Sequence, residues 1–276
     1  MKRWMRFQQT MNKKRWFELD REKNGPITLF DFSTPEDAYD AAMVEEDSDN
    51  RAVWRATNDS IIGGYSRAKM QFVRTVDDYQ NIMNGREPMC ASRWDQENGS
   101  HEQNESDGQA YVPFIRWKGN ISTKVNKEAK VQRSGFCTIL SPEFPMGGVD
   151  LGGRYNGIEI MCRSDGRPYS LNLKVESFIA DDLFQCFIKI PPTIASKGET
   201  CQTTGGEFDQ VVFLFQHFVA TAGGRLRARQ RSLDNSIKIQ SIGITLMDGN
   251  DGDFQFDLSR IRAINFDESG VIGEAD

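Results

Sequence analysis

The sequence predicts an all-β protein, an antiparallel β-sandwich with one short helix near its N-terminus. Apolar and polar residues alternate with period two in several separate runs, which is typical of strands with one face in a core and one in water. Turn signals rich in Gly, Asp and Asn separate these runs, and little helical periodicity lies between them. Many short strands of this kind favour a sandwich over a βαβ fold.

Residues 1–24 read as a basic leader or arm. Its first 17 residues hold six basic side chains and no acidic one, and Trp4, Phe7 and Met11 fall at helical spacing. An acid-free, amphipathic start of this kind resembles a mitochondrial targeting segment. A retained surface helix on anionic lipid and a solvated tail are the alternatives.

A single sandwich domain is predicted for residues 25–268, followed by a tail at 269–276. Residues 27–32 read as its first strand. A short helix is expected next, because Thr34 can cap it, Pro35 suits its first position and Asp37 completes a capping-box spacing.

Later runs of alternating residues predict further strands near 66–72, 158–163, 171–176 and 254–259. Residues 84–109 are polar and hold Trp94 as their one large aromatic residue. Such a segment buries too little surface to offset its ordering entropy, so it is predicted to be a long mobile loop.

Charge and cysteine usage exclude several classes of protein. The net charge is −6 and the pI about 5.2, which argues against a general nucleic-acid binder. The five cysteines form no Cys-x-x-Cys pair, so reduced thiols in a reducing compartment are expected. No apolar run reaches the length of a transmembrane helix.

No cofactor or metal site is predicted. The sequence has neither phosphate-loop nor dinucleotide-binding glycine patterns. His101 falls in the polar loop, and His217 is expected to be a half-buried histidine. Residues 248–253 look like a calcium loop, but Asp253 and Ser259 stand where an EF-hand needs Gly and Glu. An acidic hairpin turn is the prediction there.

Five blocks, taken together and in order, resemble the complex I intermediate-associated protein 30 family. The first is residues 54–66, in which a tryptophan-bearing strand is followed by Asp59 and a Gly-Gly-x-Ser pattern. The others are residues 133–137, 155–169, 224–227 and 241–261. The resemblance covers residues 27–266, and the segments after Gly85 and at 191–207 depart from it as expected surface loops.

The resemblance implies a galactose-binding-like β-sandwich (jelly roll) that is not an enzyme. It implies a chaperone-like role in assembling the membrane arm of NADH:ubiquinone oxidoreductase, with complex I subunits and other assembly factors as partners. The implied location is the matrix side of the mitochondrial inner membrane, where peripheral membrane contact is expected. A plastid stays the alternative, because related domains occur there.

The residues hypothesised to bind a partner come from these blocks. They are Trp54, Asp59, Gly63, Gly64, Ser66, Arg133, Ser134, Gly135, Asp165, Gly166, Arg167, Pro168, Arg225 and Arg227.

Several of the hypothesised residues have a structural alternative. Trp54 is either a core aromatic residue or a wall of a binding cleft. Asp59 and Ser66 either bond backbone groups in a tight turn or contact a partner. Arg133 and Arg167 either bond carboxylates and carbonyls inside the protein or form a binding rim.

Arg225, Arg227, Arg229 and Arg231 alternate, so in an extended chain all four would point one way. This basic strip could meet anionic lipid or an acidic partner. A solvated edge strand, charged to block aggregation, is the alternative.

Two other functions compete with the assembly factor. A carbohydrate- or small-ligand-binding module would use Trp54 and the loop aromatic residues Trp94 and Trp117 to stack its ligand. A glycoside hydrolase would use acidic pairs, with Asp59 and Asp165 as candidates.

Overall fold

The computed structural model describes residues 25–33, 45–46, 53–73, 112–127, 134–151, 153, 155–177, 182–188, 190–192, 208–222, 224–233 and 238–266 of the 276. The predicted leader, the helix expected after Thr34, the polar loop at 84–109 and the tail at 269–276 lie outside these residues.

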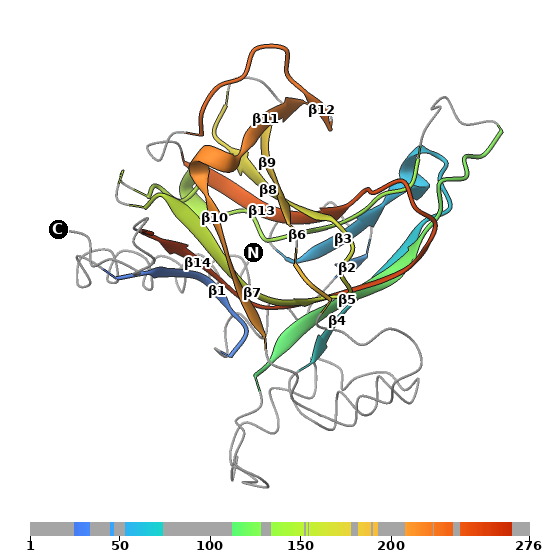
Figure 1. The fold of residues 1–276 in the computed structure, drawn as a ribbon, viewed down its shortest axis with the longest axis horizontal. Helices are drawn as coiled ribbons and strands as arrows, with labels where there is room; N and C mark the ends of the chain where they lie inside the picture. The colour runs from blue at the N-terminus through green and yellow to red at the C-terminus, as the bar shows by residue number, and fades with distance from the viewer. Residues whose placement is uncertain are drawn as a thin grey trace, which may run out of the picture.

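The described residues form strands joined by turns and short 3-10 helices (Figure 1). The strands are β1 (Ile27–Asp31), β2 (Glu45–Glu46), β3 (Arg55–Asn58), β4 (Arg67–Val73), β5 (Phe114–Ile121), β6 (Cys137–Leu140), β7 (Gly157–Ser164), β8 (Tyr169–Val175), β9 (Asp182–Ile188), β10 (Asp209–Leu214), β11 (Val219–Ala222), β12 (Arg225–Leu226), β13 (Ile239–Leu246) and β14 (Gly252–Ile264). The 3-10 helices are η1 (Asp59–Ile62), η3 (Pro145–Gly147) and η4 (Phe215–His217).

The strands make two sheets that lie face to face as two layers (Figure 1). The first sheet has the order β10-β7-β14-β5-β4, and β1 pairs with the second half of β14. The second sheet has the order β12-β11-β9-β8-β13-β6-β3-β2. All described strand pairs are antiparallel except β2 with β3. The predicted antiparallel sandwich is confirmed.

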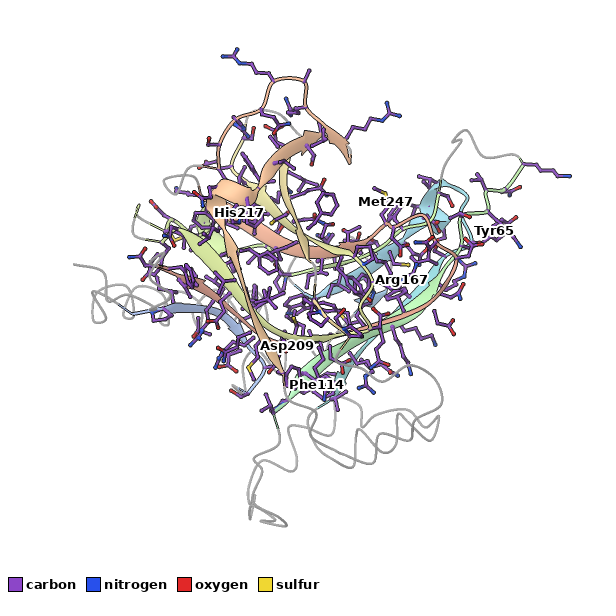
Figure 2. The ribbon with its side chains drawn as sticks, in the orientation of Figure 1. Tyr65, Phe114, Arg167, Asp209, His217 and Met247 are labelled. Atoms are coloured by element: carbon purple, nitrogen blue, oxygen red, sulfur yellow. The ribbon has the colours of Figure 1, made fainter. Side chains whose placement is uncertain are left out.

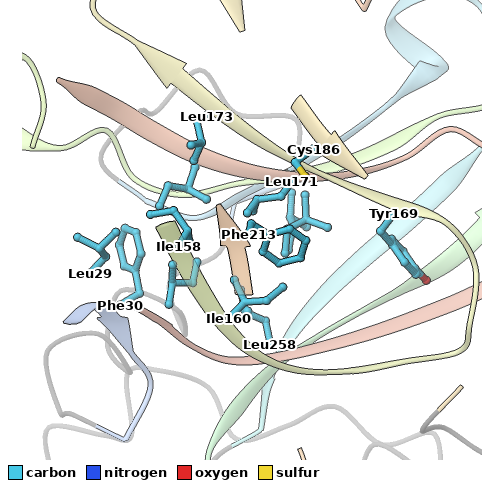
Figure 3. Close-up of a cluster of buried hydrophobic side chains, with 14 of the residues drawn as sticks. Leu29, Phe30, Ile158, Ile160, Tyr169, Leu171, Leu173, Cys186, Phe213 and Leu258 are labelled. Atoms are coloured by element: carbon cyan, nitrogen blue, oxygen red, sulfur yellow. The ribbon is translucent and has the colours of Figure 1, made fainter. Parts of the chain in front are cut away.

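The core between the sheets is built from the inward residue of each alternating pair. Figure 3 shows Ile158 and Ile160 of one sheet facing Leu171 and Leu173 of the other. All four side chains are fully buried. The period-two patterns in the sequence therefore identify the buried face correctly.

Trp54 belongs to this core. Its side chain is 1% exposed, and its ring packs edge-on against Phe30 and Phe32, with centroids 5.1 and 5.5 Å away. Trp117 is also fully buried, in the middle of β5. The expectation that Trp117 is a loop aromatic residue was wrong.

The expectation that His217 is half-buried was also wrong, because His217 lies in η4 and is exposed.

The outer face of the first sheet carries charges that are buried. Asp257 is 0% exposed, and Arg116 donates two hydrogen bonds of 2.9 Å to its two oxygens. Arg163 donates a third bond of 2.9 Å and lies over the rings of Phe114 and Phe208. This buried ion cluster joins the three central strands β5, β14 and β7.

The three cysteines within the described residues, Cys137, Cys162 and Cys186, are free and buried. Burial raises the pKa of Cys137 to about 12 and also raises the pKa of Cys162. Because the thiolate is the reactive form, we expect Cys137 and Cys162 to resist iodoacetamide near neutral pH. Peptide mass spectrometry checks this. Both sites should label fully in guanidinium, and native labelling at the same rate would contradict the prediction.

Candidate functional site

Most of the hypothesised residues gather at one end of the sandwich. Asn58, Cys137 and Leu246 are aligned across β3, β6 and β13, and Leu246 is aligned with Tyr169 of β8. The residues just beyond this row therefore lie at the same end of the second sheet, where these strands begin or finish. We call this the η1 end. It holds Asp59, Gly63, Gly64, Ser66, Ser134, Gly135, Asp165, Gly166, Arg167 and Pro168.

A fully buried carboxylate organises the first half of the η1 end. Asp59 is 0% exposed and opens η1, whose N-cap Asn58 accepts from the Ser60 amide at 2.9 Å. One carboxylate oxygen of Asp59 accepts from the Ser66 amide at 2.9 Å. The other oxygen accepts from the Ser66 hydroxyl at 2.9 Å, the Ser134 hydroxyl at 2.8 Å and the Gly135 amide at 2.6 Å. One side chain thus joins two loops that are distant in sequence.

The Gly-Gly pair leaves room for this carboxylate. Gly63 ends η1 at φ 91°, a left-handed conformation that favours glycine. A Cβ placed on Gly64 would lie 2.2 Å from the carboxylate carbon of Asp59. Any other residue at position 64 would therefore displace the Asp59 side chain.

An arginine organises the second half of the η1 end. Arg167 donates to both oxygens of Asp248, at 2.9 and 2.7 Å, from its Nε and Nη2 atoms. Its guanidinium also donates to the carbonyl oxygens of residues Asn250, Gly252 and Asp253. The turn between β13 and β14 is therefore wrapped around one guanidinium. Residues 248–253 form an acidic turn held by Arg167.

Asp165 stabilises the same region by accepting hydrogen bonds from residues on both sides of it. Its Oδ1 accepts from the Tyr169 hydroxyl and the Arg167 amide, both at 3.0 Å, and its Oδ2 accepts from the Gln255 amide at 2.8 Å. Burial, together with the charge of Asp165, raises the pKa of Tyr169. Burial alone would raise the pKa of Asp248, but the hydrogen bonds and charge of Arg167 outweigh it and lower that pKa. Both groups thus keep one protonation state near neutral pH.

The two halves are connected through the segment after β5. The Thr123 amide donates to Asp251 at 2.6 Å, which ties this segment to the β13–β14 turn. The Ser122 amide donates to the hydroxyl oxygen of Ser66 at 3.0 Å, and that hydroxyl belongs to the Asp59 network. The η1 end is therefore a continuous hydrogen-bonded frame.

This frame holds three large apolar side chains in contact with solvent. Ile61 is 72% exposed, Tyr65 51% and Met247 58%. Ile61 lies in η1, Tyr65 follows it, and Met247 is the first residue after β13. Figure 2 shows Tyr65, Met247 and Arg167 toward one side of the molecule and His217 toward the other. Sequence reasoning did not select Ile61, Tyr65 or Met247, although Tyr65 stands between Gly64 and Ser66, both of which it did select.

The remaining hypothesised residues lie elsewhere. Trp54 is in the core, so it forms no wall of a cleft. Arg133 and Trp94 lie outside the described residues. With Trp54 and Trp117 both buried, two of the three aromatic residues expected to stack a sugar are inaccessible to one.

Arg225 and Arg227 sit at the opposite end of the second sheet. The expectation that Arg225, Arg227, Arg229 and Arg231 form one strip on a single face was wrong, since Arg227 and Arg231 both pair with the buried Asp182. Strand β12 spans only Arg225 and Leu226, so the extended geometry ends there.

Within the described part of the chain, no group of three or more His, Cys, Asp and Glu residues is arranged to hold a metal ion. In that same part, no helix has both the length and the apolar character needed to cross a membrane.

The chain matches the sequence model of a family described as complex I intermediate-associated protein 30 (CIA30) over residues 30–258. Among relatives, the Neurospora crassa protein named complex I intermediate-associated protein 30, mitochondrial, is 24% identical over 265 residues, covering 91% of this chain and 78% of that protein. The mouse protein of the same name is 28% identical over 152 residues, covering 52% of this chain and 42% of its own length.

A Caenorhabditis elegans relative, named probable complex I intermediate-associated protein 30, mitochondrial, is 29% identical over 157 residues. The match covers 42% of the length of that protein. The chain thus spans less than half of the mouse and nematode proteins. All three names include the word mitochondrial, and none of them supports the plastid alternative.

Among solved structures, the family 11 carbohydrate-binding module of the Clostridium thermocellum cellulase Lic26A-Cel5E superposes with a TM-score of 0.46 at 12% identity, over 88% of this chain and 95% of that one. The same kind of module in complex with a mixed-linked tetrasaccharide gives a TM-score of 0.44 at 12% identity, over 88% and 96% of the two chains.

Proposed function

This chain belongs to the complex I intermediate-associated protein 30 family, and on that premise we propose that it is a non-catalytic assembly factor of mitochondrial respiratory complex I. It acts by binding other polypeptides on the matrix side of the inner membrane. The names of its relatives support the association with complex I intermediates and the mitochondrial location.

The apolar side chains of the η1 end are the observation that supports polypeptide binding. Ile61, Tyr65 and Met247 are all more than half exposed, although hydrogen bonds fix the loops that carry them. Exposed apolar side chains that gather in one place commonly mark an interaction site. A frame that is already ordered loses little conformational entropy when a partner binds. The η1 end therefore suits a protein-binding surface.

The buried acids of this end support a structural role rather than acid–base chemistry. The two oxygens of Asp59 accept four hydrogen bonds from the protein itself, and its side chain is fully buried. Both oxygens of Asp248 accept from Arg167. A general acid or base must reach a proton of its substrate, and these two carboxylates are committed to holding loops together.

The proposal is tested by purifying the tagged protein, expressed at its native level, from isolated mitochondria. We expect complex I subunits of partly assembled membrane-arm intermediates to co-purify with it, as quantitative mass spectrometry would show. Recovery of no complex I subunit would overturn the proposed function.

A triple variant, Ile61→Ser, Tyr65→Ser and Met247→Ser, tests the η1 end as the binding surface. We expect it to recover about tenfold less of the intermediates, because central apolar contacts are often worth about 2 kcal/mol or more. Met146→Ser is the matched control, since Met146 is 68% exposed but lies three residues before Val149, which pairs with Ile239 at the other end of the second sheet. Equal recovery by the wild type and the triple variant would assign binding to another surface.

A further inference from the structure

A second surface, the arginine hairpin, lies at the opposite end of the second sheet. We define it as residues 219–231, which comprise β11, β12 and the turn that follows. Ala222 of β11 pairs with Asp182 at the start of β9, whereas Ile188 at the end of β9 pairs with Tyr169 near the η1 end. Figure 1 shows β11 and β12 projecting at the top of the view. The hairpin holds four arginines and no acid, in a chain of net charge −6.

Two of the four arginines are neutralised by a buried carboxylate of the same chain. Asp182 is 5% exposed and forms ion pairs with Arg227 and, at 2.8 Å, with Arg231. Ser177 donates to the same carboxylate at 2.7 Å. The Arg231 guanidinium also lies 5.1 Å from the centre of the Phe184 ring. Arg227 and Arg231 therefore anchor the hairpin to the sandwich.

A glutamine fixes the turn that follows β12. The Gln230 side chain accepts from the Ala220 amide at 2.9 Å and donates to the Ala220 carbonyl at 3.1 Å. It also donates to the Arg227 carbonyl at 2.8 Å. These bonds hold residues 227–230 against β11, so the backbone that carries Arg229 is ordered before any partner arrives.

The other two arginines, Arg225 and Arg229, are exposed and form no ion pair with any residue that the structure describes. Between them in sequence stands Leu226, which is 71% exposed. A guanidinium pairs a carboxylate through two parallel hydrogen bonds, which gives both strength and direction. The hairpin thus presents two exposed guanidinium groups, each able to bind a carboxylate, beside one exposed apolar side chain.

We propose that the arginine hairpin binds an acidic segment of a partner polypeptide through Arg225 and Arg229, with Leu226 contacting an apolar residue of that segment. The inference rests on the proposed function in that the partner is a polypeptide, and it adds a second surface and the chemistry that this surface recognises. Strand β12 is the last strand in the order of its sheet. An extended segment can therefore pair with the backbone of β12 while its carboxylates meet the arginines, which favours a polypeptide over a lipid headgroup.

The test measures binding of a fluorescent peptide of repeated Glu-Glu-Leu units to the full chain by anisotropy at low ionic strength. We expect saturable binding that salt weakens, and no binding of a Gln-Gln-Leu peptide. The double variant Arg225→Gln and Arg229→Gln should bind the acidic peptide about tenfold more weakly, because it loses two charge-assisted contacts. The double variant Lys124→Gln and Lys127→Gln, which changes the charge equally at the η1 end, should change binding less than about twofold.

Three results would overturn the proposal: no saturable binding of the acidic peptide, equal weakening by the two double variants, or equal binding of the neutral peptide. Phosphatidylglycerol vesicles that bind through Arg225 and Arg229, while the peptide does not, would overturn the choice of a polypeptide. The assay contains no complex I component, so its failure would leave the mitochondrial purification result intact. Circular dichroism of each variant verifies that the sandwich is folded.

Discussion

Replacing Asp59 with alanine is expected to lower the free energy of unfolding by about 4 kcal/mol, because two buried amides and two hydroxyls lose a charged acceptor. The amides belong to Ser66 and Gly135, which lie on different loops. For a domain of this size the loss corresponds to a fall in Tm of about 10 °C. Chemical denaturation and calorimetry of the purified chain measure both quantities.

Two further variants test whether the loss of stability comes from the hydrogen bonds of Asp59 or from the removal of any negative charge. Glu176→Ala removes an exposed acid outside the η1 end and should change stability by less than about 0.5 kcal/mol. Gly64→Ala should destabilise the protein through the same network, since its Cβ would lie 2.2 Å from the Asp59 carboxylate carbon. If Asp59→Ala proved as mild as Glu176→Ala, the Asp59 network could not be what holds the η1 end together.

The strands were predictable because burial alone sets their alternation. Leu171, Leu173 and Val175 read as one buried face from sequence, and all three are buried in β8. Strand β5 escaped prediction because its period is broken: Phe114 is apolar but packs outside the main core, and Gly119 occupies an inward position. Trp117 was therefore taken for a loop residue, although it is fully buried between them.

The residue types at the η1 end were predictable, but their connections were not. Asp59 bonds Ser134 and Gly135 across 75 and 76 positions of sequence, and Arg167 bonds Asp248 across 81. Such pairs follow from the register of strands in two sheets, which a single sequence does not contain. The exposed Ile61 and Met247 were missed for a related reason, since an apolar residue next to a turn looks the same in sequence whether it faces core or solvent.

The arginine strip shows where a correct local rule stops applying. Alternation predicts a common face only as long as the chain stays extended. Strand β12 ends at Leu226, and the Gln230 side chain then folds the chain back onto Ala220. Arg227 and Arg231 consequently reach Asp182, whereas Arg225 and Arg229 stay in solvent. The split into anchoring and free arginines needed the structure.

Replacing Asp257 with alanine is expected to cost about 3–5 kcal/mol, as large as the Asp59 effect, because it removes the carboxylate shared by two buried guanidinium groups. Arg116 is 3% exposed and Arg163 9%, and their bonds to Asp257 join β5, β14 and β7. Urea unfolding at neutral pH measures the loss.

The triple variant Arg116→Met, Arg163→Met and Asp257→Leu distinguishes the two sources of the Asp257 effect. It removes the charges together and keeps apolar volume beside Phe114 and Phe208, on which Arg163 now lies. Since a buried ion cluster replaced by packed apolar side chains is often neutral or stabilising, the triple variant should be at least about 2 kcal/mol more stable than Asp257→Ala. Equal instability of the two would show that packing, and not the desolvated charge, makes Asp257 necessary at the centre of this sheet.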